Sequence, residues 1–581
     1  MGPVSRPPRT PGSLLGPRPW LQAALLTVLA AALLAPGLDA GFIWDDLQQI
    51  VASPTIDDPA APARYFALNV VESYGSSGRG ADGVDTYRPL FFVALWAIHA
   101  GAGADPFWFH LAVLVAHLGV CLLLWAAARR FIGSDLAAAS VFAVVAVHPV
   151  TAEAYLWASA LSEPLAAAGL LGAALILDRW GRGDRVAAAA AAAGAVMLLG
   201  LLAKEAVLAA LPAVSVYLWR VRGVRPRALV GPWLAATAFL VLRVAALGGL
   251  QATGSGGGQR LDAVRNLPVL VVDGLRALVT LEPVGIRQLY WAYRDLGWTA
   301  SLAAAAALLL LAAGAWRLRR TAPLLPTALA VTVCMLAPVA LIATVPGWGG
   351  FGRYLYLPWG FLALALAELG ARARPVLAAR RPWLGWVPAL LAVVFLGFQV
   401  LGLQHALAVY HNQESLARAA IELQPDAPDG WLWLGNHHVE AGDLPAAARC
   451  YAEAVALAPG LFDARHNLAA ALLALDRPAE ALEHARAAAE IHGVTPEGAV
   501  VAASACLQLG RWGEAGRWLD QGLAAAPEHP RLLELRARWL EAAPTGTQQR
   551  SGAAISGSGS DQRSGSAISI PPLLPRETPG K

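Results

Sequence analysis

Acidic and basic side chains lie beside long apolar runs at several points in this sequence. They are the pair Asp45–Asp46 and the single residues Arg88, Glu153, Glu163, Lys204, Glu205 and Arg353. An ionised side chain near the centre of an apolar helix costs ~2.5–3.5 kcal/mol on insertion scales, so such residues persist where they have a partner, water or a function. Carboxylates can orient or deprotonate a hydroxyl nucleophile, and a lysine with an arginine can hold a phosphate leaving group.

The elements that must position these charges are predicted to be membrane-spanning helices. The chain has 581 residues, of which 57% are hydrophobic and 14% charged, and this composition fits a chain largely in lipid. About eleven apolar runs cross, or nearly cross, a hydrocarbon core of ~30 Å. They are residues 20–37, 107–128, 136–150, 161–178, 186–201, 205–219, 228–247, 299–316, 323–345, 354–370 and 383–405.

Composition also argues against two other classes of protein. The net charge of +4 comes from arginines in short clusters between apolar runs, which indicates membrane topology rather than a nucleic-acid-binding patch. The four cysteines form no CxxC pair, so neither a zinc site nor a disulfide framework is indicated.

The basic clusters predict the orientation of the helices. MGPVSRPPR, Arg129–Arg130, DRWGRGDR, RVRGVRPR, WRLRR and ARARPVLAARR occupy alternate connections, beginning with the basic N-terminus at residues 1–19. The positive-inside rule puts these connections in the cytoplasm. We therefore expect residues 41–106 to form one long outer loop, in which residues 87–101 lie in the membrane interface rather than crossing it.

Under this topology the outer side collects the uncommon residues. It holds Asp45–Asp46, YRPL with Tyr87 and Arg88, HPVTAE with His148 and Glu153, the turn with Glu163, Lys204–Glu205, and GRYLYLP with Arg353 and Tyr354. Charges gathered on one leaflet suit transfer from a lipid-phosphate donor, whose tail lies in the bilayer and whose head reaches the outer surface. The predicted location is an integral membrane protein of the bacterial inner membrane, or one with a lumenal site if the source is eukaryotic.

The C-terminal part is predicted to be a helical repeat domain at residues 410–543, after a membrane domain at residues 20–409. Pro459 and Pro527 are 68 residues apart, twice the tetratricopeptide period of 34. Counting back from Pro459 puts Trp431, Gly435 and Tyr451 on the large and small positions of that repeat. Two further units begin near Phe462 and Pro496. With an odd number of spans this all-α repeat domain lies on the outer side, and residues 544–581 are predicted to be a disordered tail.

The order of these motifs resembles a known family. FIWDD, YRPLFF, PFWFHLAVLVAHLG, HPVTAEAYLWASALSEP, LLAKEA and RYLYLP, followed by the repeats, are similar to the transmembrane and tetratricopeptide-repeat proteins. These are multi-spanning C-type glycosyltransferases related to the protein O-mannosyltransferases. The resemblance covers nearly the whole chain apart from the tail. It implies inverting transfer of a sugar, typically mannose, from a polyprenyl-phosphate sugar to a Ser or Thr hydroxyl of an acceptor protein.

The same resemblance suggests a role for each matching residue. Asp45 would be the base that orients the acceptor, with Asp46 as its partner in the catalytic pair. Lys204, Arg353, Tyr354 and Arg88 would surround the donor phosphate. The remaining candidates for the site are Tyr87, His148, Glu153, Glu163 and Glu205.

Other interpretations of these residues remain open. Asp45–Asp46 could cap an interfacial helix, Lys204–Glu205 could begin a span with the lysine at the interface, and Arg353 could anchor a helix end. An Asp–Asp pair can also bind Mg²⁺ or Mn²⁺, although two acids without further ligands predict no defined metal site. A non-enzymatic repeat scaffold for envelope assembly is the alternative function, and a transporter is a third.

Overall fold

The computed structural model describes residues 19–68, 86–248, 257–281, 287, 289–344 and 351–542. Within these residues the regular structure is entirely helical, as the composition predicts. They divide into two compact units, with the boundary between Asn412 and Gln413. Nearly all of the predicted basic N-terminus, the predicted tail at 544–581 and part of the predicted outer loop (69–85) lie outside the described residues.

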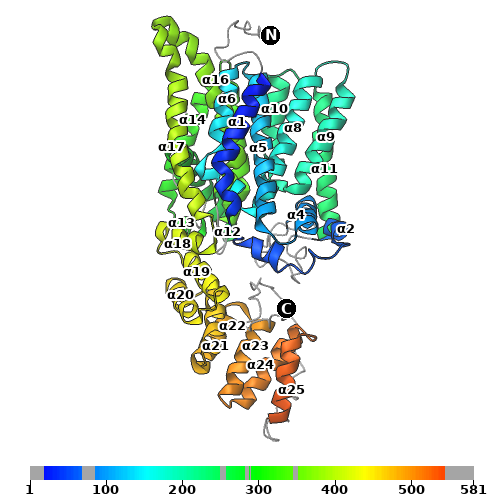
Figure 1. The fold of residues 1–581 in the computed structure, drawn as a ribbon, viewed down its shortest axis with the longest axis vertical. Helices are drawn as coiled ribbons and strands as arrows, with labels where there is room; N and C mark the ends of the chain where they lie inside the picture. The colour runs from blue at the N-terminus through cyan, green and yellow to red at the C-terminus, as the bar shows by residue number, and fades with distance from the viewer. Residues whose placement is uncertain are drawn as a thin grey trace. The chain divides into compact units, whose positions relative to one another are not determined.

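Long apolar helices dominate the first unit (Figure 1). In the part of the chain that the structure describes, nine helices are long and apolar enough to cross a membrane. Their cores are α1 (Pro19–Leu34), α5 (Pro106–Phe131), α8 (Ser162–Trp180), α9 (Val186–Ala203), α11 (Pro226–Leu247), α14 (Trp298–Leu318), α15 (Leu324–Ile342), α16 (Tyr356–Arg380) and α17 (Val387–Val409). They correspond to nine of the eleven runs predicted from the sequence.

The other two predicted spans are shorter helices. Residues 136–150 give α6 (Asp135–Ala146), which ends before His148–Pro149 because a residue that precedes proline disfavours the helical conformation. Residues 205–219 divide into a 3₁₀ turn, η6 (Glu205–Ala209), and α10 (Leu211–Arg220). At 1.5 Å per residue, α6 and α10 rise only ~18 and ~15 Å.

One long helix was not predicted from the sequence. Helix α12 (Gly257–Thr280) carries charged residues, including the ion pair Arg265–Asp262 at 3.0 Å, and therefore lacks a continuous apolar run. Its buried residues Leu270, Val271 and Leu278 form an apolar side, and the helix packs against α14 and α15. Short helix α13 (Leu289–Tyr293) follows it.

The loop after α1 is built from short helical turns. They are η1 (Ala35–Asp39), a π-helical turn η2 (Leu47–Val51), α2 (Ala61–Arg64), η3 (Tyr65–Ala67) and α4 (Pro89–Ala102). Helix α4 rises only ~21 Å, less than the ~30 Å of a hydrocarbon core, and packs against α2, η3 and α9 at one end of the bundle (Figure 1). Helix α4 is thus one of the shorter apolar helices, and the prediction that residues 87–101 lie in the membrane interface stays a prediction.

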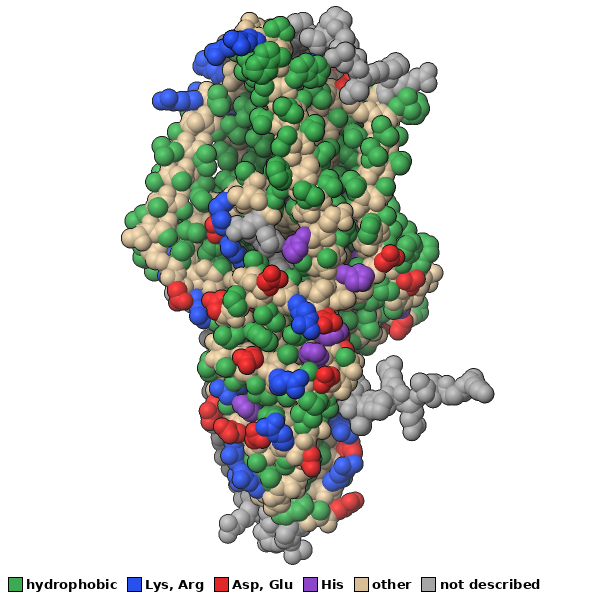
Figure 2. Space-filling view, turned by 60° about the vertical axis from the view of Figure 1, so that its left-hand side comes forward, with side chains coloured by type: hydrophobic (Ala, Val, Ile, Leu, Met, Phe, Trp, Pro, Cys, Tyr) green, Lys and Arg blue, Asp and Glu red, His purple; other side chains and the backbone are tan. Residues whose placement is uncertain are grey.

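The surface of the first unit is strongly apolar. Leu310 on α14 is 75% exposed and Leu401 on α17 is 69% exposed. Figure 2 shows hydrophobic side chains over most of the visible face of this unit, whereas charged side chains are spread over the repeat helices. Contiguous apolar surface of this extent is typical of a membrane-facing helix bundle.

Basic connections converge at the end of the bundle where α8 finishes. The carboxylate of Asp178, fully buried, forms ion pairs with Arg130, with Arg182 at 2.6 Å and with Arg222 at 2.7 Å. These arginines come from three of the basic clusters identified in the sequence. Glu163 lies 15 residues earlier on α8, so ~22 Å of helix separates it from Asp178. The candidate site residue and the basic connections therefore occupy opposite ends of α8.

The second unit consists of tetratricopeptide-like helix pairs. After α18 (Gln413–Leu423), the described pairs are α19 (Pro428–Glu440) with α20 (Leu444–Leu457), α21 (Phe462–Ala474) with α22 (Pro478–His492), and α23 (Pro496–Gln508) with α24 (Trp512–Ala525). The first helices of successive pairs begin 34 residues apart, as do the second helices. The predicted repeat period and the three predicted units are thus confirmed.

Small and large residues meet between the helices of the first pair, as the pattern predicts. A Cβ atom on Gly435 would lie 2.4 Å from the ring of Tyr451, so only glycine admits this close packing. A final helix, α25 (Pro530–Ala542), covers the end of the stack with Trp539, whose indole N–H donates to the carbonyl of Trp512 at 2.8 Å.

Candidate functional site

The two acids of the loop after α1 have different surroundings, and Asp46 is the structural one. Asp46 is fully buried, and one of its oxygens accepts a hydrogen bond from the N–H of Ile43 at 3.1 Å. Its other oxygen accepts from both the N–H (2.7 Å) and the hydroxyl of Ser159 in η5 (Ala158–Leu161). The turn that Asp46 closes contains Trp44 at φ +49°, a conformation that a non-glycine residue rarely adopts. Asp46 therefore fixes the shape of the loop.

Asp45 is the exposed member of the pair. Among the described residues it makes no hydrogen bond or ion pair, but the positive charges of Arg353 and Arg88 are close enough to act on it. The pKa of Asp45 is raised above its ordinary value, because the loss of hydration to the surrounding protein is the largest effect. The positive charges of Arg353 and Arg88 oppose this shift. The side chain of Asp45 is nevertheless exposed, so its carboxylate is accessible from solvent.

Arg353 is held by a buried glutamate. Arg353 lies in the 3₁₀ turn η7 (Gly352–Leu355), and Glu153 lies in the first turn of α7 (Glu153–Leu156). The backbone N–H of Arg353 donates to one oxygen of Glu153 at 3.0 Å, and its guanidinium donates to the other at 2.8 Å. Burial raises the pKa of Glu153 to about 7, although Arg353 opposes the shift. The guanidinium also lies 4.9 Å from the ring of Trp157 and 5.1 Å from that of Tyr354.

Two further ion pairs bring helix ends into the same group. Lys204, directly after α9, pairs with Glu163 at the start of α8, and both side chains are buried. The Lys204 ammonium lies 5.3 Å from the ring of Tyr354. Arg88, at the start of α4, donates two hydrogen bonds to Glu205 at 2.8 and 3.1 Å. A bidentate pair of this kind fixes both side chains in orientation.

Electrostatic interactions join the three ion pairs into one cluster. Glu153 interacts with Glu163 and Lys204 as well as with Arg353. Arg88 interacts with Glu163 and Tyr354 as well as with Glu205. The structure thus brings together nine of the eleven candidates from six separate segments, namely Asp45, Asp46, Arg88, Glu153, Glu163, Lys204, Glu205, Arg353 and Tyr354.

The contacts of the remaining two candidates serve packing. The hydroxyl of Tyr87 donates to the carbonyl of Phe66 at 2.9 Å, and its ring contacts Phe239. The imidazole of His148 bonds to the carbonyl of Leu278 at 3.1 Å and packs on Trp359. Neither side chain contacts the ion-pair cluster through these bonds.

A divalent cation would find few ligands here. Within the described ranges, no group of three His, Cys, Asp or Glu residues is arranged to hold a metal ion. Both oxygens of Asp46 accept hydrogen bonds from the protein, so the pair would offer a cation the Asp45 carboxylate alone. The residues present therefore do not form an acidic chelate of the kind that an Asp–Asp pair suggests.

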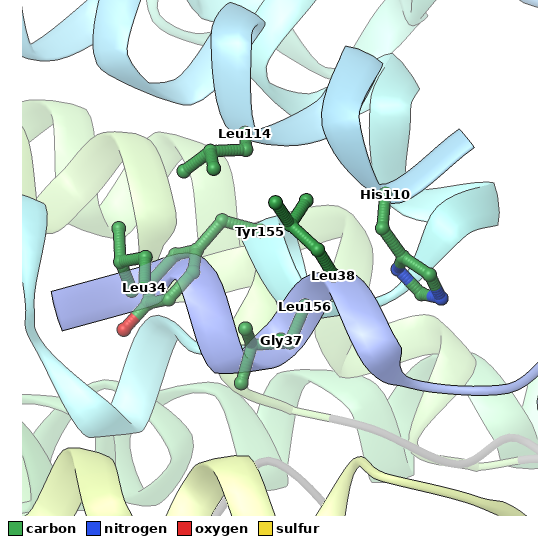
Figure 3. Close-up of a pocket in the computed structure, with 7 residues that line it drawn as sticks. All are labelled: Leu34, Gly37, Leu38, His110, Leu114, Tyr155 and Leu156. Carbon is green, nitrogen blue, oxygen red and sulfur yellow. The ribbon is translucent and has the colours of Figure 1, made fainter. Parts of the chain in front are cut away.

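A small pocket lies beside this loop, between the α1–η1 segment and helices α5 and α7 (Figure 3). Leucines, Gly37, His110 and Tyr155 line it. None of the candidate acids or bases is among the lining residues. This pocket is therefore distinct from the ion-pair cluster described above.

Three further residues of this region were not predicted from the sequence. They are Ser159, Trp157 and Tyr410, whose ring contacts that of Trp44. Ser159 and Trp157 belong to the HPVTAEAYLWASALSEP motif, so the motif itself carried the signal. Tyr410 follows the last long helix and had no distinguishing pattern.

The chain matches no protein-family model, and comparison with curated proteins finds no match. Among solved structures it is similar to the second TPR domain of the human RPAP3 protein in complex with an HSP70 peptide, with 19% identity over 20% of this chain and 98% of that chain, at a TM-score of 0.19. It is also similar to the APC/C hetero-tetramer Cut9–Hcn1, with 15% identity over 78% of this chain and 92% of that chain, at a TM-score of 0.24. The helix pairs themselves, rather than these distant likenesses, define the tetratricopeptide-like architecture.

Proposed function

We propose that this protein is a membrane glycosyltransferase that moves a sugar, mannose or another hexose, from a polyprenyl-phosphate donor to a protein hydroxyl. The observation that carries the proposal is the environment of Asp45. It is an exposed carboxylate without a partner among the described residues, on a loop fixed by Asp46, and it lies within the field of Arg353 and Arg88. Carboxylates so placed serve as general bases.

The proposed reaction uses these groups in order. Asp45 takes the proton of the acceptor hydroxyl, and the hydroxyl oxygen forms a bond to the anomeric carbon of the sugar. The bond between that carbon and the phosphate oxygen breaks, and its electron pair leaves with the polyprenyl phosphate. Arg353, Lys204 and Arg88 stabilise the negative charge on the leaving phosphate, because a fixed guanidinium or ammonium interacts strongly with it in a water-poor site.

The membrane setting supports a lipid-linked donor. Nine long apolar helices in the described part of the chain and their exposed leucines suit a bilayer, and the ion-pair cluster lies at helix ends rather than at helix centres. A donor head group would meet the cluster there while its polyprenyl tail stayed in lipid. The tetratricopeptide-like unit is proposed to bind the acceptor polypeptide and raise its local concentration. We propose that this end of the bundle is the outer, periplasmic or lumenal, side.

The test is sugar transfer in membranes that contain the wild type, Asp45→Asn or Asp57→Asn. Asp57 is a matched control because it lies in the same loop and pairs with His99, in the last turn of α4. Arg88 lies at the opposite end of that helix, as its N-cap residue. Radiolabelled polyprenyl-phosphate mannose, glucose and N-acetylglucosamine would be supplied, and label in protein counted. We expect Asp45→Asn to lose transfer by about 10²-fold or more at equal abundance, and Asp57→Asn to retain it.

A non-enzymatic scaffold is the competing function, and one observation favours it. Lys204, Arg353 and Arg88 each already pair with a glutamate, as structural ion pairs do. If the protein is a scaffold, membranes with the wild type should transfer no label to protein from any donor. The Asp45→Asn variant should then bind the same partner proteins as the wild type. Equal labelling of protein by the wild type and by Asp45→Asn would show that Asp45 is not the general base.

A further inference from the structure

Tyr410, the residue after α17, has a buried hydroxyl that the fold leaves unused. The side chain is 4% exposed, and its hydroxyl has no hydrogen-bond partner in the described part of the chain. Buried polar groups are nearly always hydrogen-bonded, so an exception of this kind points to a partner such as a bound ligand. This tyrosine belongs to the first unit, and its ring meets that of Trp44 edge to face at 6.3 Å.

The position of Tyr410 relates it to the charged cluster. Its hydroxyl is close enough to interact electrostatically with Glu153 and Arg353. Trp44, which its ring contacts, precedes Asp45 directly in the chain. The Tyr410 hydroxyl, a donor without a partner in the described part of the chain, thus lies near Arg353, which is proposed to hold the phosphate. It also lies near the loop that carries Asp45, the proposed base.

The backbone fixes Tyr410 in this place. The N–H of Gly41, at the start of the acidic loop, donates to the carbonyl of His411 at 2.8 Å. The N–H of Tyr410 donates to the carbonyl of Ala406 in α17 at 2.9 Å. Because the backbone is held from both directions and the ring is packed against Trp44, the hydroxyl cannot turn to solvent without moving the loop.

We propose that Tyr410 is a ligand-binding residue whose hydroxyl donates a hydrogen bond to a phosphate oxygen of the lipid-phosphate donor, beside Arg353. The inference rests on the proposed function, since it names a further contact in the same site. A phenol hydroxyl is a donor at neutral pH, and a bond to an anionic oxygen is about twice as strong as one between neutral groups. The bond satisfies the buried donor only when the phosphate is bound.

The test is binding of a radiolabelled polyprenyl phosphate, without sugar, to the full-length protein in lipid nanodiscs. Tyr410→Phe keeps the ring that packs against Trp44 and removes only the hydroxyl. We expect its affinity to fall about 10- to 100-fold, the range for a lost hydrogen bond to a charged group. Tyr217→Phe is the control, because this buried tyrosine packs on Phe131 at the basic end of the bundle.

Further measurements separate a phosphate contact from binding through the lipid tail alone. Polyprenol, which lacks the phosphate, should bind wild type and Tyr410→Phe with equal affinity. The Asp45→Asn variant should bind polyprenyl phosphate with normal affinity and fail only in sugar transfer. Equal affinity of wild type and Tyr410→Phe for polyprenyl phosphate would overturn the inference and leave a trapped water as the partner of the hydroxyl. Failure of the wild type to bind the lipid would overturn it too. Binding that depends on Tyr410 without transfer from any donor would uphold the contact and refute the transferase.

Discussion

Asp46 accepts hydrogen bonds from both the main-chain N–H and the hydroxyl of Ser159, a residue 113 positions later in the chain. Its neighbour Asp45 makes no such bond among the described residues and remains exposed to solvent. Adjacent acids of the same type thus have separate tasks. Asp46 anchors the loop to η5, whereas Asp45 is the residue that we propose as the general base.

This division predicts that the two asparagine substitutions differ in stability. Asp46→Asn replaces a carboxylate oxygen with an amide NH₂, which would face either the Ile43 N–H or the two donors of Ser159. We expect a loss of ~1–3 kcal/mol of unfolding free energy, the cost of leaving buried donors unsatisfied. Asp45→Asn should leave stability unchanged. Thermal unfolding of the purified variants would measure the difference, and equal stability of the two would contradict the anchoring role of Asp46.

The pH dependence of stability should report on Asp46. Burial raises its pKa from 3.8 to about 7 in the folded protein. Between these values the folded state binds more protons than the unfolded state, so a rise in pH destabilises it. The wild type should therefore lose stability relative to Asp46→Asn from about pH 4 to about pH 7, with no further change above. Denaturation across that pH range would test this, and a difference that is independent of pH would contradict it.

The buried ion pair Arg353–Glu153 should show strong coupling. Their side chains are 13% and 0% exposed. Removing one partner leaves the other charge buried without compensation, at a cost of ~3–5 kcal/mol. We expect Glu153→Gln and Arg353→Gln each to be strongly destabilising and the double variant to lose much less than their sum. A double-mutant cycle on unfolding free energy measures the coupling. Additive effects would mean that the two groups do not interact in the folded protein.

The repeat unit offers a test that does not involve the site. Gly435→Ala would bring a methyl group against the Tyr451 ring and should cost ~1–3 kcal/mol, the range for overpacking. Gly460→Ala is the control, because no described atom lies within 4 Å of its Cβ position. Limited proteolysis between α19 and α20 should become faster in Gly435→Ala alone. If both variants resist proteolysis equally, α19 and α20 do not pack as closely as the structure indicates.

Features with a fixed period or length could be predicted from the sequence. The tetratricopeptide-like pairs follow from a 34-residue period, and the nine long helices follow from apolar runs. Helix α12 was missed because its charged residues interrupt any apolar run, and α6 and α10 proved short because Pro149 and Pro212 limit them.

The sequence predicted which residues belong to the candidate site, but not which ion pairs and hydrogen bonds they form. The predicted orientation of the helices was enough to place Lys204, Glu163 and Arg353 on one side of the membrane. Which cation pairs with which glutamate depends on how the helix ends pack. The difference between Asp45 and Asp46 depends on Ser159, and the importance of Tyr410 depends on Trp44. None of these relationships has a spacing in the sequence that would reveal it.

The hydrogen bond from Gly41 to His411 has a consequence for the biogenesis of the protein. Gly41 leaves the ribosome early, but its partner emerges about 370 residues later. At translation rates of ~5–20 residues per second, the acidic loop waits on the order of 20 to 75 s for that bond. A nascent chain therefore carries an unfinished loop until the last long helix has been made, and chains that stop before His411 should lack the bond that holds the start of this loop.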